Sequence, residues 1–281
     1  MDKTLLLNTL YDILLEAGKI SCLMQENIHT ELKSDHSPVT AADLALSEFI
    51  RRELSFLPPE EHMFFDEEEI DKNGTTPAAF FQSAKPYVWF TDPIAGTACY
   101  AAGMPFYAIS IGVLKHGQPY AGGVYLPGLN EMYLSDGQHS YLYKTTEQEA
   151  VPRLLQTLPT DHLALKPLFQ HASTTVLGQY DIISKKTPFV IMPAVNIGLM
   201  WTALGRFSAS IIKLKLWDFA GAWAILKPLG IGFYNADTGA ILEKITEENL
   251  SENWSLTETH IVCQADILPL IQQRITKETS D

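Results

Sequence analysis

The sequence predicts a mixed α/β protein with an α+β N-terminal half and an α/β C-terminal half. Two segments near the N-terminus carry apolar residues at helical spacing. Short apolar and aromatic runs, broken by Gly, Pro, Asn and Asp, then fill residues 86–144 and indicate a sheet built of hairpins. Beyond residue 160, strand-like and helix-like segments alternate, which is typical of α/β organisation. With 281 residues and 46% hydrophobic content, the chain can bury a large core.

The first two elements are predicted to be amphipathic helices over residues 3–27 and 41–54. Their apolar positions are Leu6, Leu10, Ile13, Leu14 and Ala17 in the first, and Leu46, Phe49, Ile50 and Leu54 in the second. This spacing places the apolar side chains on one face of each helix. We therefore expect both helices to cover a face of the sheet that follows.

The predicted sheet ends near residue 150. Its strands are expected at residues 88–90, 107–113, 123–126, 131–134 and 140–143. A polar stretch at 144–149, followed by Pro152 and Pro159, is the best candidate for a boundary between halves. The chain is accordingly divided into residues 1–150 and 151–281.

In the second half, strands and helices alternate. Strands are predicted at 163–165, 189–191 and 261–263, and helices at 195–204, at 218–226 and after residue 263. The segment 245–258 is polar, and we expect it to be a surface loop.

Charge and cysteine content exclude several classes of protein. A net charge of −13 and a pI near 5.0 argue against nucleic-acid and anionic-membrane partners, which require clustered Lys and Arg. The three cysteines, Cys22, Cys99 and Cys263, are widely spaced, so neither a disulfide framework nor a cysteine zinc site is expected. No apolar stretch has membrane-spanning length. A cytoplasmic location fits these features best.

The most informative segment is WFTDPIAGTACY at residues 89–100. An apolar strand runs into Asp-Pro-Ile and then into a Gly-Thr pair that can begin a helix. The Asp92 carboxylate, the Ile94 carbonyl and the amides of Gly96 and Thr97 could together hold a hard divalent cation beside a phosphate. The methyl group of Ala95 cannot coordinate a metal ion.

This segment resembles the Asp-Pro-Ile-Asp-Gly-Thr motif of the inositol monophosphatase family, with Ala95 in place of the second aspartate. Further segments resemble family landmarks in the same order along the chain. They are EAGK at 16–19, KSDHSPVTAAD at 33–43, FFDEEE at 64–69, PFYAISIGVL at 105–114, GRFSASI at 205–211 and WDFAGAWAIL at 217–226. The resemblance implies a layered αβαβα sugar-phosphatase-type fold. It also implies magnesium-dependent, lithium-sensitive hydrolysis of a phosphate monoester.

The resemblance further implies a metal role for several residues. Glu67, Asp92 and the Ile94 carbonyl would bind the first Mg²⁺, for which Mn²⁺ is a possible substitute, and Glu68 is a register alternative to Glu67. A second ion would be held by Asp92, Asp218 and the residue at position 95, which here is Ala95. The N-terminal half would therefore carry most of the metal ligands.

Catalytic and substrate-binding roles are implied in the same way. Asp43 and Thr97 would orient the attacking water, while the amides of Gly96 and Thr97 would bind phosphate oxygens. Ala194 and Lys213 stand at positions where the family contacts substrate, and they differ from its usual residues. The C-terminal half would thus supply Asp218 and substrate contacts.

Each of these residues also has an ordinary explanation. An acidic run such as the one around Glu67 is usually a solvated surface. Asp43 and Asp218 could be first-turn helix acids, and Thr97 could be only a helix N-cap. The ordered set of landmarks is what favours the functional interpretation.

Three functions stay open at this point. The first is Mg²⁺-dependent hydrolysis of an inositol phosphate or a related sugar or nucleotide phosphate, impaired by Ala95. The second is an inactive pseudophosphatase that binds a phosphorylated ligand or a protein partner. The third is a 3′-nucleotide or sugar bisphosphate phosphatase, because Lys213 could favour a second anionic group on the ligand. A small phosphorylated metabolite is the expected ligand, and the resemblance implies a homodimer.

Overall fold

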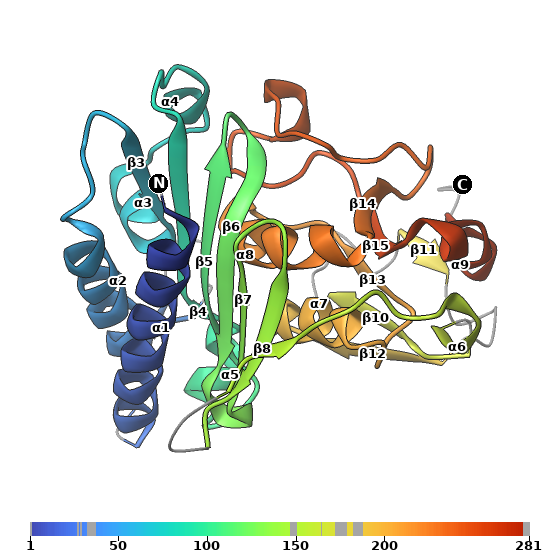
Figure 1. Cartoon of the computed structure of the whole chain (residues 1–281), viewed down its shortest axis with the longest axis horizontal. Helices are drawn as coiled ribbons and strands as arrows, with labels where there is room; N and C mark the ends of the chain where they lie inside the picture. Colours follow the sequence, from blue (N-terminus) through green and yellow to red (C-terminus); the bar gives the residue numbers. More distant parts are fainter. Residues whose placement is uncertain are drawn as a thin grey trace.

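In the computed structural model, helices and sheets alternate in five layers, with the two sheets separated by helices (Figure 1). The structure describes residues 2–26, 28, 30–32, 38–146, 151–163, 165–171, 179–181 and 188–277. The first layer consists of helices α1 (Lys3–Gln25) and α2 (Ala41–Leu54), as predicted. The mixed α/β class and the layered αβαβα arrangement are therefore confirmed.

The first sheet has seven strands in the order β3-β4-β5-β6-β7-β8-β9. Its strands are β3 (His62–Asp66), β4 (Tyr87–Ala95), β5 (Ala108–Lys115), β6 (Gln118–Leu126), β7 (Glu131–Ser135), β8 (Ser140–Lys144) and β9 (Arg153–Leu154). Strand β3 runs parallel to β4, and the remaining neighbours are antiparallel. The predicted hairpins are present, and β9 continues this sheet beyond residue 150.

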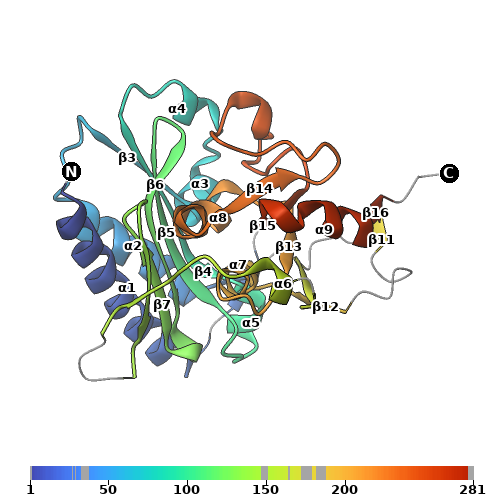
Figure 2. The ribbon, with the colours of Figure 1, turned by 45° about the vertical axis from the view of Figure 1, so that its right-hand side comes forward.

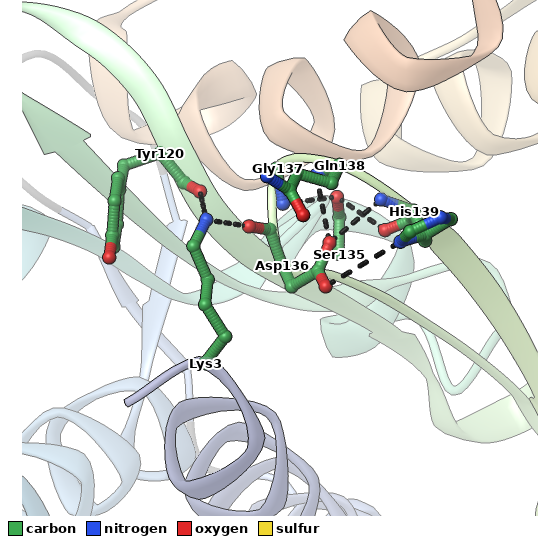
Figure 3. A network of polar contacts seen from close by, with 7 residues as sticks. All are labelled: Lys3, Tyr120, Ser135, Asp136, Gly137, Gln138 and His139. Atoms are coloured by element: carbon green, nitrogen blue, oxygen red, sulfur yellow. Dashed lines mark hydrogen bonds and ion pairs between the residues drawn. The ribbon is translucent and has the colours of Figure 1, made fainter. Parts of the chain in front are cut away.

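A lysine in the first turn of α1 holds that helix to the sheet (Figure 3). The Lys3 ammonium donates hydrogen bonds to the backbone carbonyls of Tyr120 and Asp136 and lies 4.1 Å from the centre of the Tyr120 ring. The Asp136 carboxylate in turn accepts hydrogen bonds from the amides of Gln138 and His139, at 2.8 and 2.7 Å. These hydrogen bonds hold the tip of the β7–β8 hairpin in the conformation that contacts α1.

The central layer contains α7 (Val195–Ala203) and α8 (Leu216–Leu226), which lie between the two sheets (Figure 2). At its closest approach to β5 and β6, the backbone of helix α8 lies directly against the backbone of the sheet. A Cβ added at Gly112 would lie 2.4 Å from the Gly221 nitrogen, and one at Gly122 would lie 2.6 Å from the Gly221 oxygen. Such distances are sterically forbidden, so glycine is required where the helix meets the sheet.

The second sheet has five strands in the order β12-β10-β13-β15-β14. Its strands are β10 (Leu168–His171), β12 (Phe189–Met192), β13 (Ala209–Ile212), β14 (Ile231–Asn235) and β15 (His260–Gln264). Strand β10 is parallel to β12 and β13, whereas β15 is antiparallel to β13 and β14. Helices α6 (Thr160–Leu163) and α9 (Leu268–Arg274) form the fifth layer.

Short elements complete the described chain. They are α3 (Glu67–Asn73), α4 (Ala78–Phe81), α5 (Thr97–Ala101), β1 (Thr30–Leu32), β2 (Pro38–Thr40), β11 (Tyr180–Asp181) and β16 (Thr276–Lys277). Within the KSDHSPVTAAD segment at 33–43, residues 33–37 lie outside the described part. Among the described residues, no helix has both the length and the apolar character needed to cross a membrane.

Two predictions for the second half are wrong. The strand predicted at 163–165 is absent from the described residues there, because α6 ends at Leu163 and the strand follows at β10. A three-residue apolar run is too short for its periodicity to separate helix from strand. The segment 245–258 lacks long regular structure but is not simply a surface loop, since Ile245, Leu250, Trp254 and Leu256 are buried.

Candidate active site

The Asp-Pro-Ile segment lies at an irregularity in β4. Pairing with β5 is continuous as far as Asp92, opposite Ser110, and resumes at Ala95, opposite Ala108. Pro93 has no backbone N–H to donate to the sheet, which favours such a break. Gly96 follows with φ +91°, a conformation suited to glycine, and α5 begins at the next residue. The structure therefore has the strand, turn and helix that the sequence predicts.

Three acidic residues from three different elements converge beside this turn. Glu67 is the first residue of α3, Asp92 lies on β4 and Asp218 is the third residue of α8. Each offers one carboxylate oxygen, and these three oxygens all lie within 4.8 Å of one another. The cluster brings together residues that are up to 151 positions apart in the sequence, from 67 to 218.

Helix N-termini surround the carboxylates. Glu67 and Asp218 lie in the first turns of α3 and α8, and Asp43 lies in the first turn of α2. The Asp43 Oδ2 atom accepts hydrogen bonds from the Thr40 amide and hydroxyl, at 2.8 and 2.5 Å, and Asp218 Oδ2 accepts one from the Lys215 amide at 3.0 Å. The positive ends of the helix dipoles stabilise acidic groups there. Asp43 and Asp218 therefore do cap their helices, and this capping does not exclude a further role for them.

Asp92 has the least compensated charge in this cluster. Its side chain is 1% exposed, and its Oδ1 atom has no hydrogen-bond partner among the described residues. Burial raises the pKa of Asp92 well above its usual range, and the negative charges of Glu67, Asp218, Asp43 and Glu68 raise it further. A buried oxygen that faces other carboxylates is a suitable ligand for a hard divalent cation. The residues present therefore fit a metal ion.

The Thr97 hydroxyl connects the turn to Asp43. Its Oγ1 atom lies 2.9 Å from the Ile94 carbonyl and 3.3 Å from Asp43 Oδ1. A hydroxyl has one proton to donate, so these two acceptors are alternatives. If the Ile94 carbonyl were engaged by a cation, Asp43 would be the remaining acceptor.

A cavity of about 360 Å³ opens over the turn and the acidic cluster. It is lined by Glu67, Asp92, Ile94, Ala95, Gly96, Thr97 and Asp218, and also by His171, Pro193, Val195, Lys213, Leu214, Lys215 and Ser255. Glu67 is therefore the member of the Glu67/Glu68 pair that faces the cavity, since Glu68 is not among the described lining residues.

Ala194 does not line the cavity. It is fully buried behind the turn, where a Cβ added at Gly96 would lie 2.9 Å from its own Cβ. Ala194 thus supports the turn from behind, whereas Lys213, the other residue implied in substrate binding, does line the cavity.

Sequence reasoning missed two cavity residues, His171 and Lys215. His171 ends β10, and burial lowers its pKa to about 4 although a hydrogen bond with the Pro193 backbone acts in the opposite direction. The imidazole is therefore neutral at pH 7. His171 could not be recognised from the sequence because the strand that carries it was predicted in the wrong place. Lys215 lies three residues before Asp218, and its ammonium lies 4.9 Å from the centre of the Trp217 ring.

Comparison with known proteins gives a consistent result. The model described as "Inositol monophosphatase family" matches residues 2–280. An inositol-1-monophosphatase of Mesorhizobium japonicum is 28% identical over 281 residues, covering 98% of this chain and 99% of that protein. The 3′(2′),5′-bisphosphate nucleotidase CysQ of Aggregatibacter actinomycetemcomitans is 29% identical over 147 residues, which is 48% of this chain and about half, 52%, of that relative. The solved structure of Mycobacterium tuberculosis SuhB superposes with a TM-score of 0.68 at 17% identity, covering 97% of this chain and 96% of SuhB.

Proposed function

Because this chain belongs to the inositol monophosphatase family and is thus a phosphatase, we propose that it hydrolyses a small phosphate monoester in the cavity around Asp92, with Mg²⁺ or Mn²⁺ as its metal. The observation that carries this proposal is the buried Asp92, whose Oδ1 has no hydrogen-bond partner among the described residues and which has one carboxylate oxygen within 4.8 Å of an oxygen of Glu67 and of Asp218. Without a cation this arrangement is costly, because burial and like charges both disfavour the ionised form.

Glu67, Asp92 and the Ile94 carbonyl would hold the first ion, and Asp92 and Asp218 would contribute to a second. A divalent ion at such a site lowers the pKa of bound water and stabilises charge that develops on the phosphoryl group and the leaving oxygen. The chain's own residues then supply positioning. Thr97 donates its hydroxyl hydrogen to Asp43, which leaves the Thr97 oxygen free to accept a hydrogen from the attacking water. The Gly96 and Thr97 amides, at the start of α5, would bind phosphate oxygens.

Ala95 would weaken the binding of the second metal ion. Its side chain is buried and lines the cavity next to Asp92 and across from Asp218. A methyl group there supplies neither a ligand nor negative charge, so the second ion is held by fewer carboxylates. We therefore expect slow rather than absent hydrolysis, since Asp43, Thr97 and the first set of ligands do not depend on position 95.

A ligand with a second anionic group is a further candidate, and two lysines favour it. Lys213 and Lys215 both line the cavity that contains the three carboxylates. An ammonium group in that wall can bind a phosphate or carboxylate that is not the one being hydrolysed. Bisphosphorylated sugars or nucleotides are therefore favoured over inositol 1-phosphate, and the relative from A. actinomycetemcomitans is named as a bisphosphate nucleotidase.

The proposed assembly and inhibition follow from the family resemblance, and the proposed location follows from the charge and cysteine content. We expect a cytoplasmic homodimer that Li⁺ inhibits, with no nucleic-acid or membrane partner because of the net charge of −13. Sedimentation velocity at several protein concentrations measures the oligomeric state. A species of 31.3 kDa at every concentration would contradict the dimer.

The function is tested by phosphate release from inositol 1-phosphate, a sugar bisphosphate and a 3′,5′-nucleoside bisphosphate, with Mg²⁺ or with a chelator. We expect slow, Mg²⁺-dependent release that Asp92→Asn abolishes. Lys213→Ala should lower kcat/KM for a bisphosphate more than for a monophosphate. If neither this chain nor Ala95→Asp releases phosphate from any of the three, the protein is a pseudophosphatase that binds a ligand or a partner.

A further inference from the structure

A buried tryptophan of the C-terminal half, Trp254, contacts residues of the N-terminal half near the acidic cluster. Trp254 lies in the segment predicted to be a surface loop, yet its side chain is 1% exposed. Its indole nitrogen donates a hydrogen bond of 2.7 Å to the Thr75 carbonyl, just beyond the end of α3. The residue therefore connects two parts of the chain that are 179 positions apart.

The rings around Trp254 belong to the segments that carry the three clustered acids. Its centroid lies 4.8 Å from that of Phe65, 5.9 Å from that of Phe90 and 6.1 Å from that of Trp217. Phe65 and Phe90 stand two residues before Glu67 and Asp92, and Trp217 stands immediately before Asp218. Because residues i and i+2 of a strand share a face, Phe90 and Asp92 point to the same side of β4. The single side chain of Trp254 thus packs beside all three segments that carry the acids.

The backbone around Trp254 is joined to the start of α8. The Leu216 amide donates to the Trp254 carbonyl at 3.0 Å, and the Leu256 amide donates to the Leu214 carbonyl at 2.8 Å. Lys215 pairs with Ser255, and both of these residues line the cavity. Movement of the Trp254 backbone would therefore displace the segment that leads into Asp218.

Trp254 adopts this position in an unfavourable backbone conformation. Its φ is +67°, in the left-handed region that a bulky side chain rarely occupies. Such residues persist only where surrounding contacts determine them, often next to functional sites. The hydrogen bond to Thr75 and the three ring contacts are the contacts that hold it here.

We propose that Trp254 is a positioning residue that sets the separation of Glu67, Asp92 and Asp218 across the two halves. It is not catalytic, since Trp254 itself is not among the described residues that line the cavity. Its ring packs against residues just before the three acids, and its indole N–H holds the chain just beyond the end of α3. This proposal rests on the proposed metal role of these three residues. It goes further by naming the residue that holds them at binding distance.

The test compares Trp254→Phe with Trp89→Phe on the full chain. Trp89 is a matched control because it is also fully buried and also donates one indole hydrogen bond, to His62 Nδ1 at 2.9 Å. It belongs to the core between the sheet and α1 and α2, not to the core that contains Trp254. Mn²⁺ affinity is measured by calorimetry, and stability by urea unfolding in chelator.

We expect Trp254→Phe to weaken Mn²⁺ binding by about tenfold, as residues that support metal ligands commonly do when changed. Trp89→Phe should lose comparable stability while its Mn²⁺ affinity stays within about twofold of the parent. Equal affinity for the two variants would overturn the proposal. If Trp254→Phe does not fold, Phe65→Leu removes a contacting ring from the other half. Phe65→Leu should also weaken Mn²⁺ binding, and unchanged affinity would overturn the proposal.

Asp92→Asn separates this inference from the proposed function. If Asp92→Asn binds Mn²⁺ as well as the parent, the metal site itself is wrongly assigned. If Asp92→Asn loses binding but Trp254→Phe behaves like Trp89→Phe, the metal site stands and the positioning role of Trp254 is wrong.

Discussion

Two buried carboxylates, Asp92 and Glu131, are in opposite electrostatic situations. Glu131 on β7 is 4% exposed, and it accepts hydrogen bonds from Tyr133 and Lys144, both at 2.6 Å, and from Arg206 at 3.2 Å. Burial alone would raise its pKa, but these hydrogen bonds and positive charges lower it below the usual value. Asp92 is equally buried, yet its charged neighbours are acidic and its pKa is raised.

The difference separates a structural group from a functional one. Glu131 is compensated within the chain, and its contacts join β7 to β8 and, through Arg206, to the segment after α7. Asp92 lacks such partners among the described residues, so its charge would have to be compensated by a bound cation or removed by a retained proton. A cation that binds the folded protein would then stabilise it by mass action. The following predictions test this contrast, from the largest effect to the smallest.

The largest effect is expected for Ala95→Asp, which adds a carboxylate beside Asp92. Mg²⁺-dependent phosphatase activity should rise by at least about a hundredfold, because the second ion gains a ligand and can stabilise the leaving oxygen. The restored activity should also become sensitive to Li⁺. Phosphate release over a range of Mg²⁺ concentrations measures both effects.

Ala95→Asn is the matched control, since it has nearly the same shape without the charge, and it should gain far less activity. If Ala95→Asp folds and binds metal but releases no phosphate, the pseudophosphatase function is favoured. The departures at Ala194 and Lys213 would then be the first places to look for the lost activity.

The next effect concerns metal affinity. Asp92→Asn should weaken Mg²⁺ or Mn²⁺ binding by at least about thirtyfold, or roughly 2 kcal/mol, because it removes a buried ligand and its charge. Glu131→Gln should leave the affinity unchanged, since that carboxylate is already satisfied by Lys144, Tyr133 and Arg206. Calorimetric titration of both variants measures the contrast. Equal affinities would mean that Asp92 is not a ligand.

A smaller effect is expected on stability. Glu131→Gln should lower the free energy of unfolding by roughly 1.5 kcal/mol, because it leaves Lys144 and Arg206 without their acidic partner. The side chains of both cations are almost half exposed, so water offsets part of the loss. Urea unfolding in chelator measures this change. A variant as stable as the parent would show that the ion pairs contribute nothing net.

The smallest effect is a pH dependence. The folded-state pKa of Asp92 lies above the unfolded value of about 3.9, so the folded protein retains a proton that the unfolded chain has released. Its contribution to stability is complete below the unfolded pKa and is lost as pH rises through the folded pKa. In chelator, Asp92→Asn should therefore become more stable relative to the parent as pH increases from 4.5 to 7.5. A constant difference over this range would contradict the raised pKa.

Local sequence patterns predicted much of the fold. The two N-terminal helices were recognised because their apolar spacing extends over several turns, and α2 begins and ends at the predicted residues. Strand β10 was misplaced and β13 and β14 were not predicted, since a strand buried on both faces shows no alternation of apolar and polar residues. Trp254 was missed because a single apolar residue in a polar segment gives no local signal for long-range packing.

The candidate site likewise contains some residues that could be predicted from the sequence and others that could not. Asp92, Ile94, Gly96 and Thr97 could be predicted together because one continuous motif contains them. The convergence of Glu67 and Asp218 on Asp92 was expected from the family resemblance and not from the residues themselves. His171 and Lys215 could not be anticipated, because their place in the cavity wall depends on how the second sheet meets the first.

The glycine contacts between α8 and the first sheet have a consequence for how this protein can evolve. Gly112, Gly122 and Gly221 leave no space for even one added carbon, so a single substitution at any of them forces helix and sheet apart. Because α8 carries Asp218 and the sheet carries Asp92, the same change would widen the gap between two of the clustered acids. The distance between α8 and the first sheet is therefore fixed by glycine, the smallest residue available. Cavity residues outside this contact, such as Lys213 and His171, are not subject to that constraint.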